Sequence, residues 1–273
     1  MGGGRMSILI TPPGHVRMEN PGLTARGDGC TSTSMANRRD FLAKAGAAGG
    51  ALAAVALGVD TPAETAGGTC KVLLVNGSPH EKGCTYTALS VVAEELEKNG
   101  VQAEIIHVGS GPTFDCTACG FCHRAGGGKC VFKEDACNEI IEKAKEAQGF
   151  VFGSPVYYGH PSGRLLGVMD RLWVAGGRYL TGKPAAAVAS SRRAGSLATL
   201  DAIQKHFSIN QMPTVASFYW NEVHGNAPEE VLKDEEGLAI MRQLGANMAR
   251  AAKAFAALPP AQQLPRATTN FIR

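Results

Sequence analysis

The sequence predicts a doubly wound α/β domain built on a five-stranded parallel sheet. From Lys71 onward, short apolar runs alternate strictly with amphipathic helical segments, which is the pattern of a parallel sheet covered on both faces. Apolar residues make up 44% of the 273 residues, enough to form a buried core. We therefore expect one domain over residues 69–258, with ligands bound beyond the carboxyl ends of its strands.

Each predicted strand is a short apolar run. The five runs cover residues 71–76, 101–108, 149–153, 185–190 and 213–219. Polar Gln102 and Glu104 are interleaved in the second run, which suits a strand at the edge of the sheet. Trp220 directly follows the fifth run, and we interpret it as a packing residue; contact with the edge of a ligand bound there is the alternative.

The predicted helices have apolar side chains at helical spacing. They cover residues 85–99, 135–148, 162–174 and 197–207, and a last segment that begins near 229 or 233 and ends at 258. Leu89, Val92 and Leu96 illustrate the apolar face of the first helix. Cys137 lies on the apolar face of the second, so we interpret it as a core residue.

Charge gives little indication of a polyanionic partner. The chain has 27 Lys and Arg against 24 Asp and Glu residues, a net charge of +3. Such a balance produces no strong field toward nucleic acid or an anionic membrane. We therefore expect no nucleic-acid partner.

Residues 1–68 differ in composition from the predicted domain. Arg38 and Arg39 precede a weakly apolar, Ala- and Gly-rich stretch at residues 45–59, a combination typical of a twin-arginine export signal whose true start would lie near residue 35. This stretch is shorter than the roughly 20 residues of a membrane-spanning helix, so we expect no stable membrane span. The prediction is a periplasmic or otherwise exported protein; the alternative is a disordered leader on a cytoplasmic protein. Residues 259–273 are predicted to form a C-terminal tail.

Two loops at the predicted carboxyl edge of the sheet have the composition of ligand-binding loops. The first, residues 76–87, is rich in Gly, Ser and Thr and enters a helix, so its N–H and hydroxyl groups suit a phosphate monoester. It matches neither the Walker pattern nor G-x-G-x-x-G, and an ordinary turn with Thr85 as the helix N-cap is the alternative. The second, residues 153–163, places Tyr157 and Tyr158 where flat side chains can contact a planar heterocycle.

Together, these loops resemble those of a known family. Gly77-Ser78-Pro79 before Gly83-Cys84-Thr85, residues 154–159 and Met169-Asp170-Arg171 resemble the NADPH-dependent FMN reductase family and its iron-sulfur flavoprotein branch. The resemblance covers about residues 71–207 and implies a flavodoxin-like fold, bound FMN and a homo-oligomer.

The resemblance also implies the residues that contact FMN. The phosphate would lie among Ser78, His80, Gly83, Cys84 and Thr85, and the rest of the cofactor among Pro155, Val156, Tyr157, Tyr158, Gly159 and Ser190. Two positions depart from the family, which usually has Asn in place of Cys84 and often Arg in place of His80. Arg192 and Arg193 lie in a third loop, residues 190–195, either as contacts to an anionic cofactor or as solvated side chains.

A cluster of cysteines is the most informative spacing in the chain. Cys116, Cys119 and Cys122 are each separated by two residues, and Cys130 follows after seven more, within a predicted insertion at residues 109–134. The first three resemble the C-x2-C-x2-C run of bacterial ferredoxins, and the glycines at 126–128 allow the chain to return Cys130 to the same site. A four-iron four-sulfur cluster is the leading interpretation. Structural zinc, disulfides and cysteines that hold no cluster are the alternatives.

Together with the family resemblance, these features predict an FMN-dependent oxidoreductase that takes electrons from NAD(P)H, a reductase of the FMN or quinone type. The chemistry would centre on the flavin, so we assign no catalytic acid or base. One alternative is an iron-sulfur flavoprotein that carries single electrons from a redox-protein donor without a nicotinamide. A zinc-stabilised binding module without flavin is a third possibility. Export would favour a redox protein as donor, since NAD(P)H is scarce outside the cytoplasm.

Overall fold

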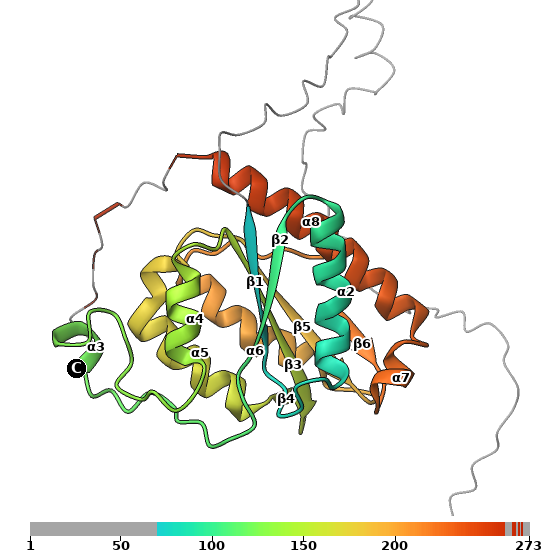
Figure 1. Ribbon diagram of the computed structural model, residues 1–273, viewed down its shortest axis with the longest axis horizontal. Helices are drawn as coiled ribbons and strands as arrows, with labels where there is room; N and C mark the ends of the chain where they lie inside the picture. Colours follow the sequence, from blue (N-terminus) through green and yellow to red (C-terminus); the bar gives the residue numbers. More distant parts are fainter. Residues whose placement is uncertain (1–69, 260–263, 266, 268, 270–273) are drawn as a thin grey trace, which may run out of the picture. The chain divides into compact units, whose positions relative to one another are not determined.

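A computed structural model describes residues 70–259, 264–265, 267 and 269, and it contains the predicted parallel sheet (Figure 1). The sheet has the order β2-β1-β3-β5-β6, which is the flavodoxin-like arrangement. Its parallel strands are β1 (Lys71–Asn76), β2 (Gln102–His107), β3 (Gly149–Tyr157), β5 (Ala185–Ser191) and β6 (Glu222–His224). The prediction of a doubly wound fold is confirmed, and β2 occupies the expected edge. The predicted leader at residues 1–68 and most of the predicted tail lie outside the described residues.

Helices cover both faces of the sheet (Figure 1). One layer contains α4 (Cys137–Ala144), α5 (Gly163–Gly176) and α6 (Ser196–Ile209), and the other contains α2 (Cys84–Lys98) and α8 (Glu235–Ala257). Along β1 successive side chains point to opposite faces, so Leu73 and Val75 pack in the first layer and Val72 and Leu74 in the second. All four side chains are buried, as expected for a central strand.

The predicted fifth strand at residues 213–219 is wrong. Only Thr214 forms a bridge, to Ala185, and regular pairing resumes at β6, where Val223 lies opposite Ser190. Between these points the buried Asn221 side chain donates to Ala187 O at 3.1 Å and accepts from Ser217 N at 3.2 Å, in place of the missing strand hydrogen bonds. The chain therefore bulges away from the sheet, and Trp220 precedes β6 instead of ending a strand.

Other boundaries differ by smaller amounts. β3 continues beyond the predicted end at residue 153, because Ser154 and Pro155 still pair with β5, and it returns through the short antiparallel β4 (His160–Pro161). The last predicted helix is divided into α7 (Pro228–Val231) and α8. The short α3 (Phe121–Arg124) and the 3-10 turn Gly177–Tyr179 were not predicted.

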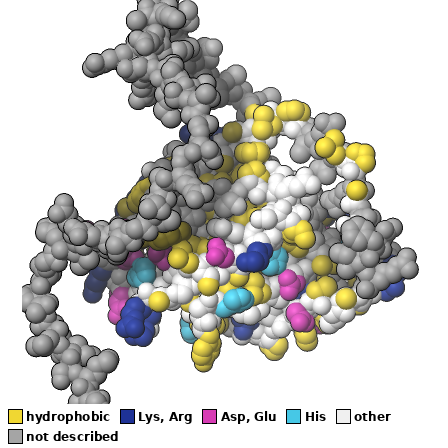
Figure 2. Space-filling model, turned by 180° about the vertical axis from the view of Figure 1, so that it is seen from behind, with side chains coloured by type: hydrophobic (Ala, Val, Ile, Leu, Met, Phe, Trp, Pro, Cys, Tyr) yellow, Lys and Arg dark blue, Asp and Glu magenta, His cyan; other side chains and the backbone are white. Residues whose placement is uncertain are grey.

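Two surface properties complete the description. Among the described residues on the face seen in Figure 2, Lys and Arg side chains are interspersed with Asp, Glu and His instead of gathering in one patch. Within the described part of the chain, the helices lack the combination of length and apolarity required to cross a membrane.

Candidate functional site

The loop between β1 and α2 is fixed against the end of β3. Gly77 N donates to Gly153 O at 2.8 Å, and Ser162 Oγ donates to Gly77 O at 2.6 Å. A Cβ atom at Gly77 would lie 2.6 Å from Leu165 Cβ, a distance that real Cβ atoms do not adopt. Only glycine therefore allows the loop to approach this closely.

Three buried hydroxyl side chains lie in or beside this loop and at the end of β5, and two of them are in contact. Ser78, Thr85 and Ser190 are all buried. Ser78 Oγ accepts a hydrogen bond from His80 N at 3.0 Å, and Thr85 Oγ1 lies 2.8 Å from Ser190 Oγ. The fold thus joins residues predicted in the first loop with one predicted at the end of β5.

The amino terminus of α2 has no side-chain cap. Gly83 occupies the N-cap position, and no side chain accepts a hydrogen bond there, whereas Ser162 caps α5 and Asp234 caps α8. The alternative interpretation of Thr85 as an N-cap is therefore wrong, because Thr85 lies inside the first turn. Uncapped N–H groups and the positive end of the helix favour an anion at this position.

The remaining residues of the first loop lie in different surroundings. His80 is exposed, while the partly buried Cys84 directs its thiol toward Gly225 O at 3.7 Å. Burial raises the pKa of the Cys84 thiol. His107 Nε2 lies 2.7 Å from Ser78 O, so this side chain fixes the loop from β2.

The predicted tyrosine loop forms the tip of a hairpin between β3 and β4. Tyr158 and Gly159 have positive φ values of 53° and 72°, as a two-residue hairpin turn requires. Tyr157 and Tyr158 are exposed, whereas Pro155 and Val156 precede them on β3. The hairpin packs on the β5–α6 loop, where a Cβ at Gly195 would lie 2.8 Å from Gly159 Cα. Two aromatic rings thus project from the carboxyl edge of the sheet.

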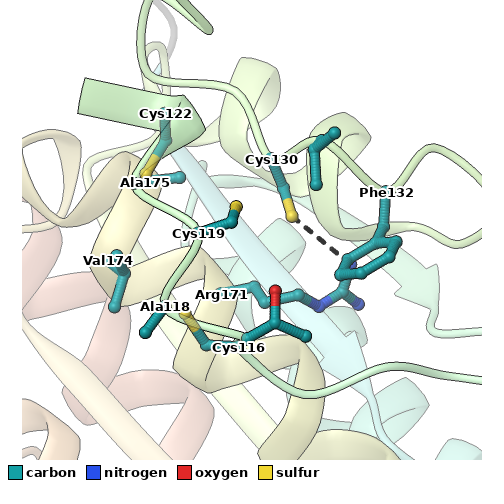
Figure 3. A pocket seen from close by; sticks show the side chains of 12 residues that line it. Cys116, Ala118, Cys119, Cys122, Cys130, Phe132, Arg171, Val174 and Ala175 are labelled. Atoms are coloured by element: carbon teal, nitrogen blue, oxygen red, sulfur yellow. Dashed lines mark hydrogen bonds between the residues drawn. The ribbon is translucent and has the colours of Figure 1, made fainter. Parts of the chain in front are cut away.

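The four predicted metal ligands line one pocket (Figure 3). Cys116, Cys119, Cys122 and Cys130 surround it, and α5 contributes Arg171, Val174 and Ala175. Cys119 is exposed and the other three are partly buried. The insertion therefore brings together the cysteines that the spacing had singled out.

Backbone contacts explain how the insertion closes. Arg124 Nη2 donates to Cys119 O at 2.6 Å, and Gly128 N donates to Cys122 O at 3.0 Å. Gly127 and Gly128 have positive φ values of 56° and 88°, a conformation that favours glycine. The chain reverses at these glycines and returns Cys130 to the pocket, as predicted.

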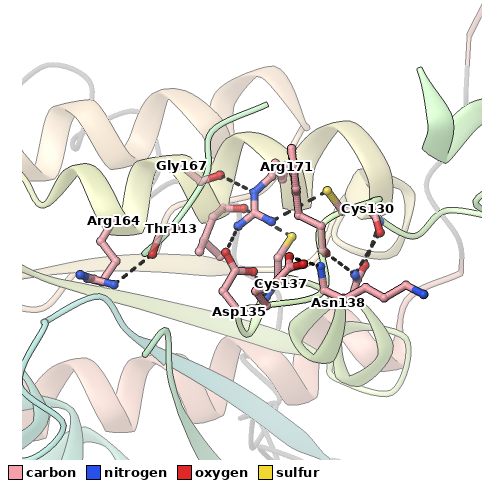
Figure 4. Close-up of polar contacts among 12 residues, drawn as sticks. Thr113, Cys130, Asp135, Cys137, Asn138, Arg164, Gly167 and Arg171 are labelled. Carbon is pink, nitrogen blue, oxygen red and sulfur yellow. Dashed lines mark hydrogen bonds and ion pairs between the residues drawn. The ribbon is translucent and has the colours of Figure 1, made fainter. Parts of the chain in front are cut away.

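Cys130 is held from two helices (Figure 4). Its backbone N donates to Asn138 Oδ1 at 2.8 Å, and Asn138 Nδ2 donates to Cys130 O at 3.0 Å. Arg171 Nη1 donates to Cys130 Sγ at 3.8 Å, while the same guanidinium forms an ion pair with Asp135. Sequence reasoning missed Asn138 and Asp135 and identified Arg171 only within a resembling motif. The available signal was an arginine among the core-facing residues of α5.

The residues of the pocket fit an iron-sulfur cluster in donor type and number. Four Cys thiolates are the usual ligands of a four-iron four-sulfur cluster, and each binds a different iron. All seven cysteines among the described residues are free thiols. In the same part of the chain, no three His, Cys, Asp or Glu side chains are arranged to hold a single metal ion. The thiols are thus distributed around a pocket that the protein itself forms.

Cys137 does not line this pocket. Its side chain is fully buried, and its thiol contacts Val168 O at 3.9 Å. Burial raises the pKa of Cys137 to about 12. The prediction that Cys137 is a core residue is confirmed.

Comparisons with known proteins find similarity to a flavin reductase family and to iron-sulfur flavoproteins. The family described as NADPH-dependent FMN reductase matches residues 70–227. An iron-sulfur flavoprotein from Methanocaldococcus jannaschii is 32% identical over 191 residues, which cover 67% of this chain and 97% of that protein. A second iron-sulfur flavoprotein from the same organism is 30% identical over 187 residues, which cover 63% of this chain and 92% of the relative.

Solved structures support the fold. RosB with a bound 8-demethyl-8-formylriboflavin-5'-phosphate intermediate aligns with a TM-score of 0.55 at 14% identity, covering 75% of this chain and 92% of RosB. The apo form of an NADH:FMN oxidoreductase aligns with a TM-score of 0.50 at 19% identity, covering 70% of this chain and 92% of the other. At these identities, the similarity concerns the arrangement of the helices and strands.

Proposed function

Because the chain belongs to the NADPH-dependent FMN reductase family, we propose that it is an FMN-dependent oxidoreductase that accepts electrons from NAD(P)H and carries a four-iron four-sulfur cluster. The observation that carries the flavin assignment is the contact between the Thr85 and Ser190 hydroxyls beside the uncapped amino terminus of α2. The four-cysteine pocket supports the cluster. The iron-sulfur flavoprotein relatives support the combination of both groups in one chain.

The residues at the sheet edge would hold FMN in two parts. The N–H groups of the first turn of α2 and the Ser78 hydroxyl would bind the phosphate. Tyr157 and Tyr158 would contact the ring, and the exposed Arg192 and Arg193 would attract an anionic nicotinamide cofactor. When bound, FMN supplies a hydride acceptor that can also release electrons one at a time.

At the second site, Cys116, Cys119, Cys122 and Cys130 would hold the cluster, which supplies one-electron transfer. The Asn138 side chain fixes the backbone of Cys130 through two hydrogen bonds. A ligand held in this way has a lower ordering cost when it binds.

A second candidate function is favoured by the exposure of Cys119. This ligand lies at the solvent-facing side of the pocket, where a protein partner can approach the cluster. The chain would then act as a one-electron carrier and would have no need of a nicotinamide. The two candidates differ in the donor that they require.

The first experiment is anaerobic purification followed by analysis of FMN, iron and acid-labile sulfide. The proposal expects FMN near one per chain and about four irons with matching sulfide. A colourless protein with stoichiometric zinc would contradict it and would support the binding module.

The second experiment adds NADPH or NADH to the anaerobic protein and records the visible absorbance of the flavin. Rapid loss of absorbance supports the NAD(P)H-dependent oxidoreductase. If neither nucleotide reduces a flavin that dithionite does reduce, the reductase assignment is wrong and the electron carrier is favoured.

A further inference from the structure

A buried cation lies beside the fourth cysteine of the pocket. The side chain of Arg171 is only 1% exposed and that of Asp135 only 5%. The guanidinium contacts three different groups: Gly167 O from Nε at 3.2 Å, the Asp135 carboxylate, and Cys130 Sγ from Nη1 at 3.8 Å. Figure 4 shows Asp135 and Cys130 on different sides of the guanidinium.

Packing alone does not require this ion pair. Removing two charges from water carries a large desolvation cost, and replacing such a pair by apolar residues of similar volume is often neutral or stabilising. The neighbours of Arg171 on α5, Val168 and Leu172, are fully buried apolar side chains. With Asp135 also replaced, an apolar residue at position 171 would therefore continue the core, so the charge at this position calls for another role.

The surroundings strengthen the effect of this charge on the pocket. The Phe132 ring centroid lies 6.0 Å from the guanidinium carbon, and both residues line the pocket. Because water is excluded from Arg171, its field is screened much less than that of a surface arginine. The pair is also asymmetric: Arg171 contacts a pocket sulfur directly, whereas Asp135 contacts the backbone N of the core residue Cys137 at 3.1 Å.

We propose that Arg171 is a positioning residue that raises the reduction potential of the cluster held by the four cysteines, and that Asp135 moderates this effect. The inference rests on the proposed function, because it presumes that the pocket holds a cluster. Reduction adds one electron, taken from the flavin or from a redox protein, and thus one negative charge to the pocket. The cation and its hydrogen bond to Cys130 stabilise that charge, while the Asp135 carboxylate opposes it.

The test compares Asp135→Asn with the double variant Arg171→Gln/Asp135→Asn. These proteins differ only at position 171, and the double variant avoids leaving an unpaired buried carboxylate. The midpoint potential is measured by a dye-mediated anaerobic titration followed by electron paramagnetic resonance. We expect the midpoint potential of the wild type to be lower than that of Asp135→Asn. The potential of the double variant should also be lower than that of Asp135→Asn, by an amount that changes the reduction equilibrium about tenfold or more, which is about 59 mV for one electron.

Arg178→Gln is the matched control. Arg178 also contacts the insertion, with Nη2 3.3 Å from Gly127 O, but it is exposed to solvent. Its removal should leave the potential nearly unchanged, because water screens its charge. A shift as large as that caused by the loss of Arg171 would mean that any nearby positive charge has this effect, and would overturn a specific role for Arg171.

The outcomes separate the inference from the proposed function. A wild-type protein without iron and sulfide after anaerobic reconstitution contradicts the cluster and the inference together. A loaded wild type with equal potentials in Asp135→Asn and the double variant overturns the inference alone, as a purely structural role predicts. If Asp135→Asn does not fold, the midpoint potential of the double variant must be lower than that of the wild type. If the double variant does not bind a cluster, the midpoint potential of Asp135→Asn must be higher than that of the wild type.

Discussion

The side-chain hydroxyls of Thr85 and Ser190 lie 2.8 Å apart, although 105 residues separate them in the sequence. Both side chains are buried, so each hydroxyl satisfies the other at the edge of the sheet. The contact joins the first turn of α2 to the end of β5. It therefore couples the two segments that the proposed FMN site requires.

Thr85→Val is expected to destabilise the protein and to weaken FMN binding. Loss of the hydroxyl leaves Ser190 Oγ buried without its partner, which costs about 1–3 kcal/mol in the free energy of unfolding. Thr85 also lies in the first turn of α2, at the proposed phosphate site, so we expect FMN to bind about tenfold more weakly, equivalent to about 1.4 kcal/mol. Urea unfolding and titration of flavin fluorescence measure the two effects.

Ser90→Ala provides the control on the same helix. Ser90 Oγ donates to Tyr86 O at 2.9 Å. Ser90 lies five residues after Thr85 on α2 and is only partly buried. The affinity of the Ser90→Ala protein for FMN should match that of the wild type. Equal FMN affinity in Thr85→Val and Ser90→Ala would place the flavin phosphate elsewhere.

Cys116→Ser is expected to reduce the iron content strongly, whereas Cys70→Ser should leave it unchanged. Cys116 lines the pocket, but Cys70 packs against the other helical layer. Serine is a much poorer ligand for iron in a cluster than a thiolate. Iron and sulfide analysis after anaerobic purification checks this, and equal iron content in the two variants would contradict the assignment of the pocket.

Gly77→Ala should destabilise the fold, while Gly163→Ala should not. A Cβ at Gly77 would lie 2.6 Å from Leu165 Cβ, whereas nothing lies within 4 Å of a Cβ at Gly163. Overpacking of this kind typically costs about 1–3 kcal/mol, and alanine within a helix is usually favourable. Thermal unfolding of both variants provides the measurement. A Gly77→Ala protein as stable as the wild type would show that the loop can move away from α5.

The sequence was informative wherever local pattern determines the structure. β1 matches its predicted range because every residue from Val72 to Val75 is apolar and buried, which is a local signal. The fifth strand was misplaced because Asn221 replaces strand pairing with side-chain bonds to Ala187, 34 residues away. Pattern alone gives no indication of such a distant bond.

The cysteine pocket shows the same limit. Spacing identified its four cysteines, since all of them belong to one short insertion. The contact of Arg171 with Cys130 was not identified, because Arg171 lies on a helix 41 residues further along the chain. Its pairing with Asp135 depends on how α4 and α5 pack, which no short motif encodes.

The sequence pattern around Arg38 and Arg39 predicts export by the twin-arginine route. This prediction can be tested with residues 35–70 fused to a reporter that functions only after such export. Arg38→Lys/Arg39→Lys in the same fusion is the matched control, because it retains the charge and removes the arginine pair. We expect export of the first fusion and retention of the second. Retention of both would indicate a leader without a signal function.

Lys183 provides a prediction about pH. Burial lowers the pKa of Lys183 from 10.5 to about 8, while its Nζ donates to Ala144 O at 2.9 Å. Between these two pH values the unfolded chain binds the proton more tightly than the folded protein does, so this group makes the free energy of unfolding rise with pH. Below pH 8 the folded protein must hold a partly buried charge, and the destabilisation that this charge causes is fully present.

Lys183→Met should therefore have its largest gain in the free energy of unfolding, relative to the wild type, at pH 7. This gain should shrink as the pH approaches 10.5. Urea unfolding of both proteins at several pH values gives this difference directly, and other titrating groups cancel in it. A difference that stays constant across the range would show that Lys183 titrates as it does in the unfolded chain.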